Sequence, residues 1–208
     1  MRLYKVPGLV QKLMKGYTWH RDRKVNTVYL TFDDGPVPGV SDFVLRQLDD
    51  YKMKANFFMV GDNVQKHTSL ALEVARAGHG IGNHTFHHLK APKTSPRVYL
   101  DDVANCQKVI EDELEVCAKT FRPPYGRLGN NLVSSLSQEY EIVLWDLISW
   151  DFKQELQTQK ALKKIKQYTE NGSIVLFHDQ QKSKANLQQI LPPYLDFLAS
   201  NGFKTGVL

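Results

Sequence analysis

Thr31-Phe32-Asp33-Asp34-Gly35-Pro36 sets the interpretation of the whole chain. A run with strand-like alternation stops there at two adjacent carboxylates, which two turn-forming residues follow. Side-by-side carboxylates repel each other unless both are solvated or a cation lies nearby. The stretch therefore predicts the end of a strand with a cation site beside it, and the other groups of that site are to be sought elsewhere in the chain.

Strand-like and helix-like patterns alternate along the chain. Short apolar or alternating runs predict strands at residues 28–33, 55–60, 80–83, 120–122, 142–145, 173–177 and 203–208. Apolar residues at helical spacing predict helices at residues 41–51, 64–78, 95–114, 132–136, 162–168 and 187–198. We expect the last helix to kink or restart at Pro192-Pro193, because proline lacks the amide hydrogen that a helix interior needs.

This regular alternation, with short connections, indicates an α/β fold with parallel strands and crossover helices. An eight-unit barrel typically takes about 250 residues. Seven strands in 208 residues therefore predict a single domain with a smaller (β/α)7 barrel that need not close completely. A doubly wound open sheet is the competing topology, and the pattern alone does not separate the two.

Composition excludes several classes of protein. The chain is 42% hydrophobic and 24% charged, as is typical of a soluble globular domain. It has no apolar run long enough for a transmembrane helix, and basic residues interrupt residues 1–24 too often for a signal peptide. The chain as given is expected in the cytoplasm, with export by another route or a trimmed signal left open.

The formal net charge of +5 is mild and spread along the chain, so no nucleic-acid partner is expected. Residues 1–24 are expected to form a basic segment that packs on, or leads into, a domain of residues 25–208. A membrane-surface helix in that segment is a secondary alternative, and membrane association is not expected. Cys106 and Cys117 share one helical pattern about 16 Å apart, which is too far for a disulfide.

Unusual polar residues gather at the predicted strand ends. They are Asp33, Asp34, His84, Arg122, Trp145-Asp146 and His178-Asp179. The carboxyl ends of the strands of an α/β barrel meet at one face, where such barrels place their active sites. Solvent exposure alone would not select the same end of each strand, so this placement predicts a functional cluster.

His84 and His88 have the spacing that places two imidazoles on one face of a helical turn, and such pairs bind zinc. The pair is weak evidence alone, because surface histidines at this spacing are common. With Asp34, the set leaves positions open for water and substrate. No glutamate follows His84, so the base must come from elsewhere, and Asp33 is the candidate. His87 is expected to be structural or exposed.

Two other strand ends carry candidate catalytic groups. Arg122 precedes Pro123-Pro124, a stiff turn that would hold its guanidinium beside Asp33 and keep that carboxylate ionised. Backbone amides after the turn could donate to a developing oxyanion, and an ordinary proline-rich loop is the alternative. His178 is a candidate general acid whose pKa Asp151 would raise, or else a buried structural histidine.

Five stretches, in order, resemble the polysaccharide deacetylases of carbohydrate esterase family four, also called the NodB homology domain. The resemblance covers Thr27 to Leu208. The first stretch, Thr31-Phe32-Asp33-Asp34-Gly35, looks like the first motif of that family. The resemblance implies that Asp33 is the catalytic base and Asp34 a metal ligand.

The second and third motifs are matched as well. His84-Thr85-Phe86-His87-His88 is similar to the second motif, which implies His84 and His88 as the other metal ligands. Arg122-Pro123-Pro124-Tyr125-Gly126 is similar to the third. By that resemblance Arg122 orients the base, and the backbone amide of Tyr125 helps to bind the oxyanion.

The last two motifs imply the acid and the walls of the groove. The matching stretches are Trp145-Asp146 with Trp150-Asp151-Phe152 for the fourth motif, and Leu176-Phe177-His178-Asp179 for the fifth. The resemblance implies that His178 is the acid and that Asp151 tunes it. It also implies that Leu176 lies in the acetyl-methyl pocket and that Trp150 and Phe152 border the groove, although Phe152 stands where the family commonly has tryptophan.

This family's fold is a distorted (β/α)7 barrel, and its activity is metal-dependent removal of acetyl groups from glycans. The resemblance thus implies a hydrolase acting on N-acetylated or O-acetylated glycans, above all on N-acetylglucosamine units of peptidoglycan or chitin-type oligomers. It implies a divalent metal, zinc first, with cobalt, nickel or manganese as alternatives. The expected partner is the glycan, with the chain a monomer or weak oligomer. A pseudoenzyme that only binds carbohydrate, and a hydrolase of small cyclic amides, remain as alternatives.

Overall fold

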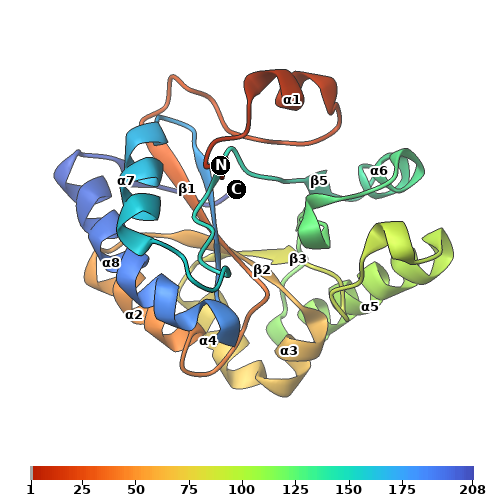
Figure 1. The fold of residues 1–208 in the computed structure, drawn as a ribbon. Helices are drawn as coiled ribbons and strands as arrows, with labels where there is room; N and C mark the ends of the chain where they lie inside the picture. Colours follow the sequence, from red (N-terminus) through yellow and green to blue (C-terminus); the bar gives the residue numbers. More distant parts are fainter. Residues whose placement is uncertain (1) are drawn as a thin grey trace.

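The computed structural model describes residues 2–208 as one α/β unit (Figure 1). The strands are β1 (Thr27–Asp33), β2 (Ala55–Met59), β3 (Gly80–Asn83), β4 (Thr120–Phe121), β5 (Glu141–Ile142), β6 (Leu147–Ile148), β7 (Ile174–His178) and β8 (Lys204–Thr205). The helices are α1 (Gly8–Leu13), α2 (Ser41–Asp50), α3 (Gly61–Lys66), α4 (Thr68–Arg76), α5 (Pro96–Leu114), α6 (Asn130–Leu136), α7 (Thr158–Tyr168) and α8 (Lys184–Ser200). Three short 3₁₀ turns are η1 (Ala91–Lys93), η2 (Pro124–Gly126) and η3 (Gln181–Ser183).

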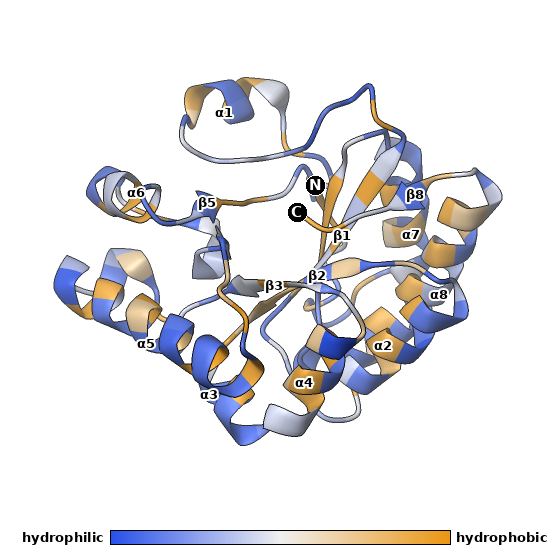
Figure 2. Cartoon of the chain, turned by 180° about the vertical axis from the view of Figure 1, so that it is seen from behind, coloured by the Kyte–Doolittle hydropathy of each residue, from blue (hydrophilic) through white to orange (hydrophobic). Residues whose placement is uncertain are grey.

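Seven strands form one curled parallel sheet in the order β5-β4-β3-β2-β1-β7-β6, and β8 pairs with the start of β1. In residues 2–208 no ladder joins β5 to β6, so the barrel stays open at that seam. The helices form an arc around the strands in both views (Figures 1 and 2). The predicted single α/β domain with an incompletely closed (β/α)7 barrel is therefore confirmed, and the sheet is not doubly wound.

Alternation along β1 divides its side chains between two environments. Leu30 and Phe32 belong to the main hydrophobic core, which the outer helices complete. The ring of Phe32 stacks between those of Phe57 and Phe177, with centroid distances of 5.2 Å and 5.6 Å. Because successive side chains of a strand point to opposite faces, Thr31 and Asp33 point into the barrel instead. The apolar pattern of β1 thus directs its carboxylate toward the interior.

Residues 2–24 lie across the open seam of the barrel (Figure 1). Thr18 pairs with Val143, just after β5, and Lys5 pairs with Leu147 of β6. The amide of Thr18 donates to Ile142 at 2.8 Å. Since this segment makes backbone hydrogen bonds with both edges of the seam, it satisfies donors and acceptors that an open sheet would leave without partners.

Several predicted elements differ from the structure. The predicted strand at 142–145 is replaced by two short strands, β5 and β6, and the last strand is confined to Lys204–Thr205. The predicted helix at 64–78 is two helices, α3 and α4, because His67 has non-helical backbone angles (φ −131°, ψ 43°). Helix α5 ends at Leu114, so Cys117 lies beyond the helix that contains Cys106; both cysteines are free, as expected.

Helix α8 runs without interruption through Pro192 and Pro193, so of the expected kink or restart, the restart is wrong. Its buried face consists of Leu187, Ile190, Leu191, Tyr194, Leu195 and Leu198. Packing of that face outweighs the missing amide hydrogens of the two prolines. No helix within residues 2–208 combines the length and the apolar character that crossing a bilayer requires.

Candidate active site

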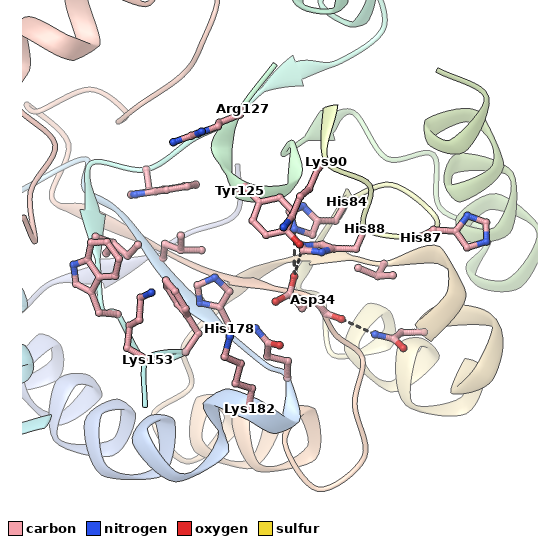
Figure 3. Close-up of a pocket in the computed structure, with 18 of the residues that line it drawn as sticks. Asp34, His84, His87, His88, Lys90, Tyr125, Arg127, Lys153, His178 and Lys182 are labelled. Carbon is pink, nitrogen blue, oxygen red and sulfur yellow. Dashed lines mark hydrogen bonds and ion pairs between the residues drawn. The ribbon is translucent and has the colours of Figure 1, made fainter. Parts of the chain in front are cut away.

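The candidate site lies in a cavity of about 1050 Å³ at the carboxyl ends of the strands (Figure 3). Strand β1 ends at Asp33 and β7 ends at His178, and these two residues are directly paired in the ladder. The cavity wall includes Asp34, His84, His88, Tyr125, Leu176 and His178. The parallel register therefore brings together residues that are far apart in the sequence.

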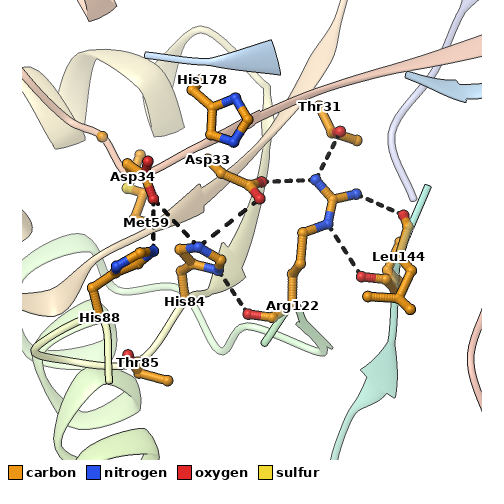
Figure 4. A network of polar contacts seen from close by, with 12 residues as sticks. Thr31, Asp33, Asp34, Met59, His84, Thr85, His88, Arg122, Leu144 and His178 are labelled. Atoms are coloured by element: carbon orange, nitrogen blue, oxygen red, sulfur yellow. Dashed lines mark hydrogen bonds and ion pairs between the residues drawn. The ribbon is translucent and has the colours of Figure 1, made fainter. Parts of the chain in front are cut away.

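Arg122, at the end of β4, holds Asp33 inside the barrel (Figure 4). Its guanidinium is fully buried and donates to Asp33 Oδ1 at 2.7 Å and to Thr31 Oγ1 at 2.8 Å. Two further hydrogen bonds reach the carbonyl oxygens of Val143 and Leu144, at 3.1 Å and 2.9 Å. Burial lowers the pKa of Arg122, and the carboxylate of Asp33 opposes that shift. The guanidinium and the carboxylate therefore form a rigid buried pair.

Asp34 faces away from this pair, toward two imidazoles. Its Oδ1 lies 3.0 Å from His88 Nε2 and 3.4 Å from His84 Nε2. Burial would raise the pKa of Asp34, but polar contacts with His84 and His88, and the nearby His178, together lower it far below its usual range. Asp34 is thus a carboxylate beside two nitrogen donors.

The loop that carries His84 and His88 is not the helical turn that the spacing predicted. Thr85 and His88 have positive φ angles of 65° and 55°, which no α-helix contains. The loop is held by hydrogen bonds from its backbone: Thr85 N donates to Asn83 Oδ1 at 2.9 Å, and the amides of Phe86 and His87 donate to Asp102 Oδ2 at 3.0 Å. The two imidazoles come together because side-chain carboxylate and amide groups impose this loop shape.

Asp179 holds the turn that follows Asp34, and it was not assigned a role from the sequence. Its carboxylate accepts hydrogen bonds from the Gly35 amide at 3.0 Å and from Ser41 Oγ at 2.5 Å. Burial raises the pKa of Asp179 to about 7, against the lowering effect of these bonds. A Cβ at Gly35 would overlap the carboxylate. The close approach of Gly35 and Asp179 therefore positions the turn that carries Asp34, whose own φ is 84°.

His178 and Asp151 form a second buried pair. Asp151 Oδ1 lies 2.8 Å from His178 Nδ1, and its Oδ2 accepts the backbone amide of His178 at 2.7 Å. Burial lowers the pKa of His178, but attraction to Asp151 outweighs it, and the pKa is raised to about 9. His178 is thus a cationic proton donor at neutral pH, with Nδ1 occupied by Asp151.

Aromatic and aliphatic side chains complete the wall. Phe152 meets His178 edge-on at a centroid distance of 4.7 Å and packs beside Trp150 at 5.6 Å. Trp150 Nε1 donates to the carbonyl of Leu3 at 2.9 Å, so the N-terminal segment supports this wall. Tyr125 has a φ of 62° and lies 4.9 Å from the ring of His88.

Asp146 does not join the cluster, contrary to the expectation for strand ends. It accepts hydrogen bonds from Arg23 at 2.7 Å and from the amide of Ile174 at 2.8 Å. Ile174 begins β7, whereas His178 ends it, so Asp146 lies at the opposite edge of the sheet. The turn between β5 and β6, which the pattern did not show, accounts for the difference. His87 is largely exposed and bound to Asp102, and it is not part of the group formed by Asp34, His84 and His88.

Five basic residues around the cavity were also missed. They are Lys90, Lys93, Arg127, Lys153 and Lys182. A signal for three of them was present in the sequence, since Lys90, Arg127 and Lys153 each follow a candidate site residue by two positions. Because those site residues end strands or form short turns, their neighbours border the same cavity.

The donor atoms of Asp34, His84 and His88 suit a divalent metal ion. They lie within 4.8 Å of one another, and Asp34 Oδ1 is buried without a hydrogen bond in the described part of the chain. His84 Nδ1 lies 2.6 Å from the carbonyl of Arg122, so Nδ1 carries hydrogen and Nε2 is left with a free lone pair. Two imidazoles and one carboxylate are a donor set that zinc prefers, with a position left open.

The chain matches the family model for polysaccharide deacetylase over residues 20–142. A peptidoglycan-N-acetylglucosamine deacetylase of Bacillus cereus is 33% identical, and the match covers 91% of this chain and 90% of the relative. A chitooligosaccharide deacetylase of Azorhizobium caulinodans is 28% identical over 74% of each chain. Other peptidoglycan deacetylases that match are longer, and this chain spans 33% to 62% of their length.

A similar structure has also been solved. The crystal structure of the peptidoglycan N-acetylglucosamine deacetylase Bc1960, in complex with 4-naphthalen-1-yl-N-oxidanyl-benzamide, is 26% identical in sequence and has a TM-score of 0.85. The superposition covers 97% of this chain and 94% of that one. The similarity therefore extends over the whole α/β unit and is not limited to the motifs.

Asp102→Ala removes the carboxylate that holds the 84–88 loop, and we expect it to weaken zinc binding by roughly ten- to a hundredfold, as loss of groups that orient metal ligands commonly does. Calorimetric titration of zinc into metal-free protein measures this. Asp101→Ala, an exposed neighbour on the same helix, is the matched control and should bind zinc as the unmodified protein does. Equal zinc affinity in the two variants would contradict the role given to Asp102.

Proposed function

Since this chain belongs to the polysaccharide deacetylase family and is a glycan deacetylase of that family, we propose that it removes acetyl groups from N-acetylglucosamine units with a divalent metal, zinc first, held by Asp34, His84 and His88. The observation that carries this proposal is a set of three neighbouring groups: a carboxylate held by arginine, a three-residue donor cluster, and a histidine–aspartate pair. The donor cluster and His178 line one cavity. A site that only binds carbohydrate needs none of the three. When bound, a divalent ion there supplies Lewis-acid activation of water and of the acetyl carbonyl.

Asp33 is proposed as the base. Its Oδ1 is engaged by Arg122, and its Oδ2 lies 3.9 Å from His84 Nε2, next to the donor cluster but outside it. Asp33 can therefore take the proton of a water molecule that attacks the acetamide carbon. Arg122 holds the carboxylate in one orientation through a charge-assisted hydrogen bond at 2.7 Å.

Two further groups of the cavity wall are proposed to act after the water attacks the acetamide carbon. The backbone amide of Tyr125 is proposed to donate to the oxyanion that forms on the acetyl oxygen. His178, held by Asp151, is proposed to give its proton to the departing nitrogen, so that acetate and a free amino sugar leave. Leu176 is proposed to contact the acetyl methyl group, and Trp150 and Phe152 to border the sugar.

Replacing His178 by alanine should lower acetate release from N-acetylglucosamine oligomers at least about a hundredfold, because the amine then leaves without an acid. The measurement is acetate production by zinc-loaded protein, with thermal melting as the check on folding. His20→Ala replaces an exposed histidine that does not line the cavity; it is the control and should retain activity. A variant without His178 that turned over at near the original rate would remove His178 from the mechanism.

The dependence of acetate release on pH should reflect the pKa of His178, which the contact with Asp151 raises. The acid must be protonated, so activity is present below the raised pKa of about 9 and is lost as pH rises through it. Asp151→Asn removes the attraction and leaves the burial that lowers the pKa, so the alkaline limb should move down by at least about one pH unit. An alkaline limb that stayed in place in this variant would assign that limb to another group.

A further inference from the structure

The turn formed by residues 150–153, after β6, carries both Asp151 and Phe152, so its position sets the partner of His178 and one wall of the cavity. The backbone amide of Lys153 donates to the carbonyl of Trp150 at 2.9 Å, which closes the turn. Trp150 has a positive φ of 61°, which is uncommon for a bulky side chain and persists only where the surroundings impose it. Contacts from outside the turn must therefore hold it in this shape.

Asn186, in the first turn of α8, makes such a contact through its side-chain amide. Its Nδ2 donates to the carbonyl oxygens of Asp151 and Lys153, each at 2.7 Å. Both partners are acceptors, so only the nitrogen end of the amide can face them, and both of its hydrogens are used. The neighbouring Leu187 is fully buried and fixes this part of the helix. The 150–153 turn is thus bound to a helix that the core holds in place.

Asp151 is thereby held at both its side chain and its main chain. Its carboxylate binds Nδ1 and the backbone amide of His178, at 2.8 Å and 2.7 Å, and its carbonyl oxygen binds Asn186. His178 ends β7 and Asn186 belongs to the helix that follows, so both contacts join the 150–153 turn to the connection between β7 and α8. The described residues that line the cavity do not include Asn186, which can therefore act on the reaction only through the residues that it holds.

We propose that Asn186 is a positioning residue that keeps the carboxylate of Asp151 aligned with His178, so that this imidazole can give its proton to the departing nitrogen. This inference rests on the proposed deacetylation and adds a residue to its mechanism. Misplacing a catalytic group by about 1 Å can cost roughly a hundredfold in rate, so loss of this support should be visible in turnover.

A double-mutant cycle between Asn186→Ala and Asp151→Asn tests the proposal, with kcat for acetate release from N-acetylglucosamine oligomers by zinc-loaded protein as the measurement. Alone, Asn186→Ala should lower kcat roughly tenfold to a hundredfold. In the Asp151→Asn background it should lower kcat less than about twofold, because the carboxylate that Asn186 aligns is already gone. Gln188→Ala, at an exposed position of α8 outside the cavity lining, is the matched control and should leave kcat unchanged.

The dependence of kcat on pH gives a second measurement, which a purely structural contact would not change. The charged groups near His178 are the carboxylates of Asp33, Asp34 and Asp151, together with Lys153 and Lys182, whose Nζ atoms lie over the adjacent Phe152 ring. Asn186→Ala leaves all of them in the chain and removes only the support of Asp151. The alkaline limb should therefore move down, as in Asp151→Asn but by a smaller amount, because the attraction to the imidazolium is weakened and not abolished.

Asn186→Asp is the second variant if thermal melting shows that the alanine variant does not fold. It keeps the size of the side chain and removes both donors, and an acidic residue is favourable in the first turn of a helix. An equal fall in kcat in the original and the Asp151→Asn backgrounds, or an unchanged kcat and alkaline limb, would overturn this inference and leave the deacetylase proposal standing. No acetate from the unmodified protein would instead overturn the deacetylase proposal on which this inference rests.

Discussion

The buried pair of Arg122 and Asp33 is the interaction on which the site depends. A fully buried guanidinium is costly unless its donors are satisfied, and here they reach Asp33, Thr31 and two carbonyls that follow β5. The pair therefore joins the central strand β1 to the far side of the sheet. Removing one partner of such a pair typically costs about 3–5 kcal/mol, because the other charge is left buried and alone. Stability and the proposed chemistry thus rest on the same contact.

Two adjacent carboxylates avoid repulsion because the backbone separates their surroundings. Asp33 is the last residue of β1 and follows its alternation into the barrel, toward Arg122. Asp34 has left the strand, with a φ of 84°, and turns toward His84 and His88. The contact between Gly35 and Asp179 holds the turn that makes this separation. This separation is what the proposed division between a base, Asp33, and a metal ligand, Asp34, requires.

Strand alternation and the turn residues were enough to predict the parallel α/β fold and to bring Asp33, His84, Arg122 and His178 to one face. The shape of the 84–88 loop could not be predicted, because hydrogen bonds to Asp102, distant in sequence, impose it. Asp146 was misplaced because a short turn separates β5 from β6. The five basic residues that line the cavity were missed because a basic side chain shows in sequence neither the cavity that it borders nor its partners, and the position of three of them two residues after a candidate site residue was not used. Local periodicity is readable from sequence, whereas pairing between distant side chains is not.

The division of work between the two aspartates is the central claim, and paired zinc titration and acetate assays of Asp33→Asn and Asp34→Asn test it most directly. We predict that Asp33→Asn, if thermal melting shows it folded, binds zinc with near-original affinity and releases acetate at least about a hundredfold more slowly. Asp34→Asn should lose zinc binding itself. Equal loss of zinc in both variants, or near-original acetate release by Asp33→Asn, would contradict the account.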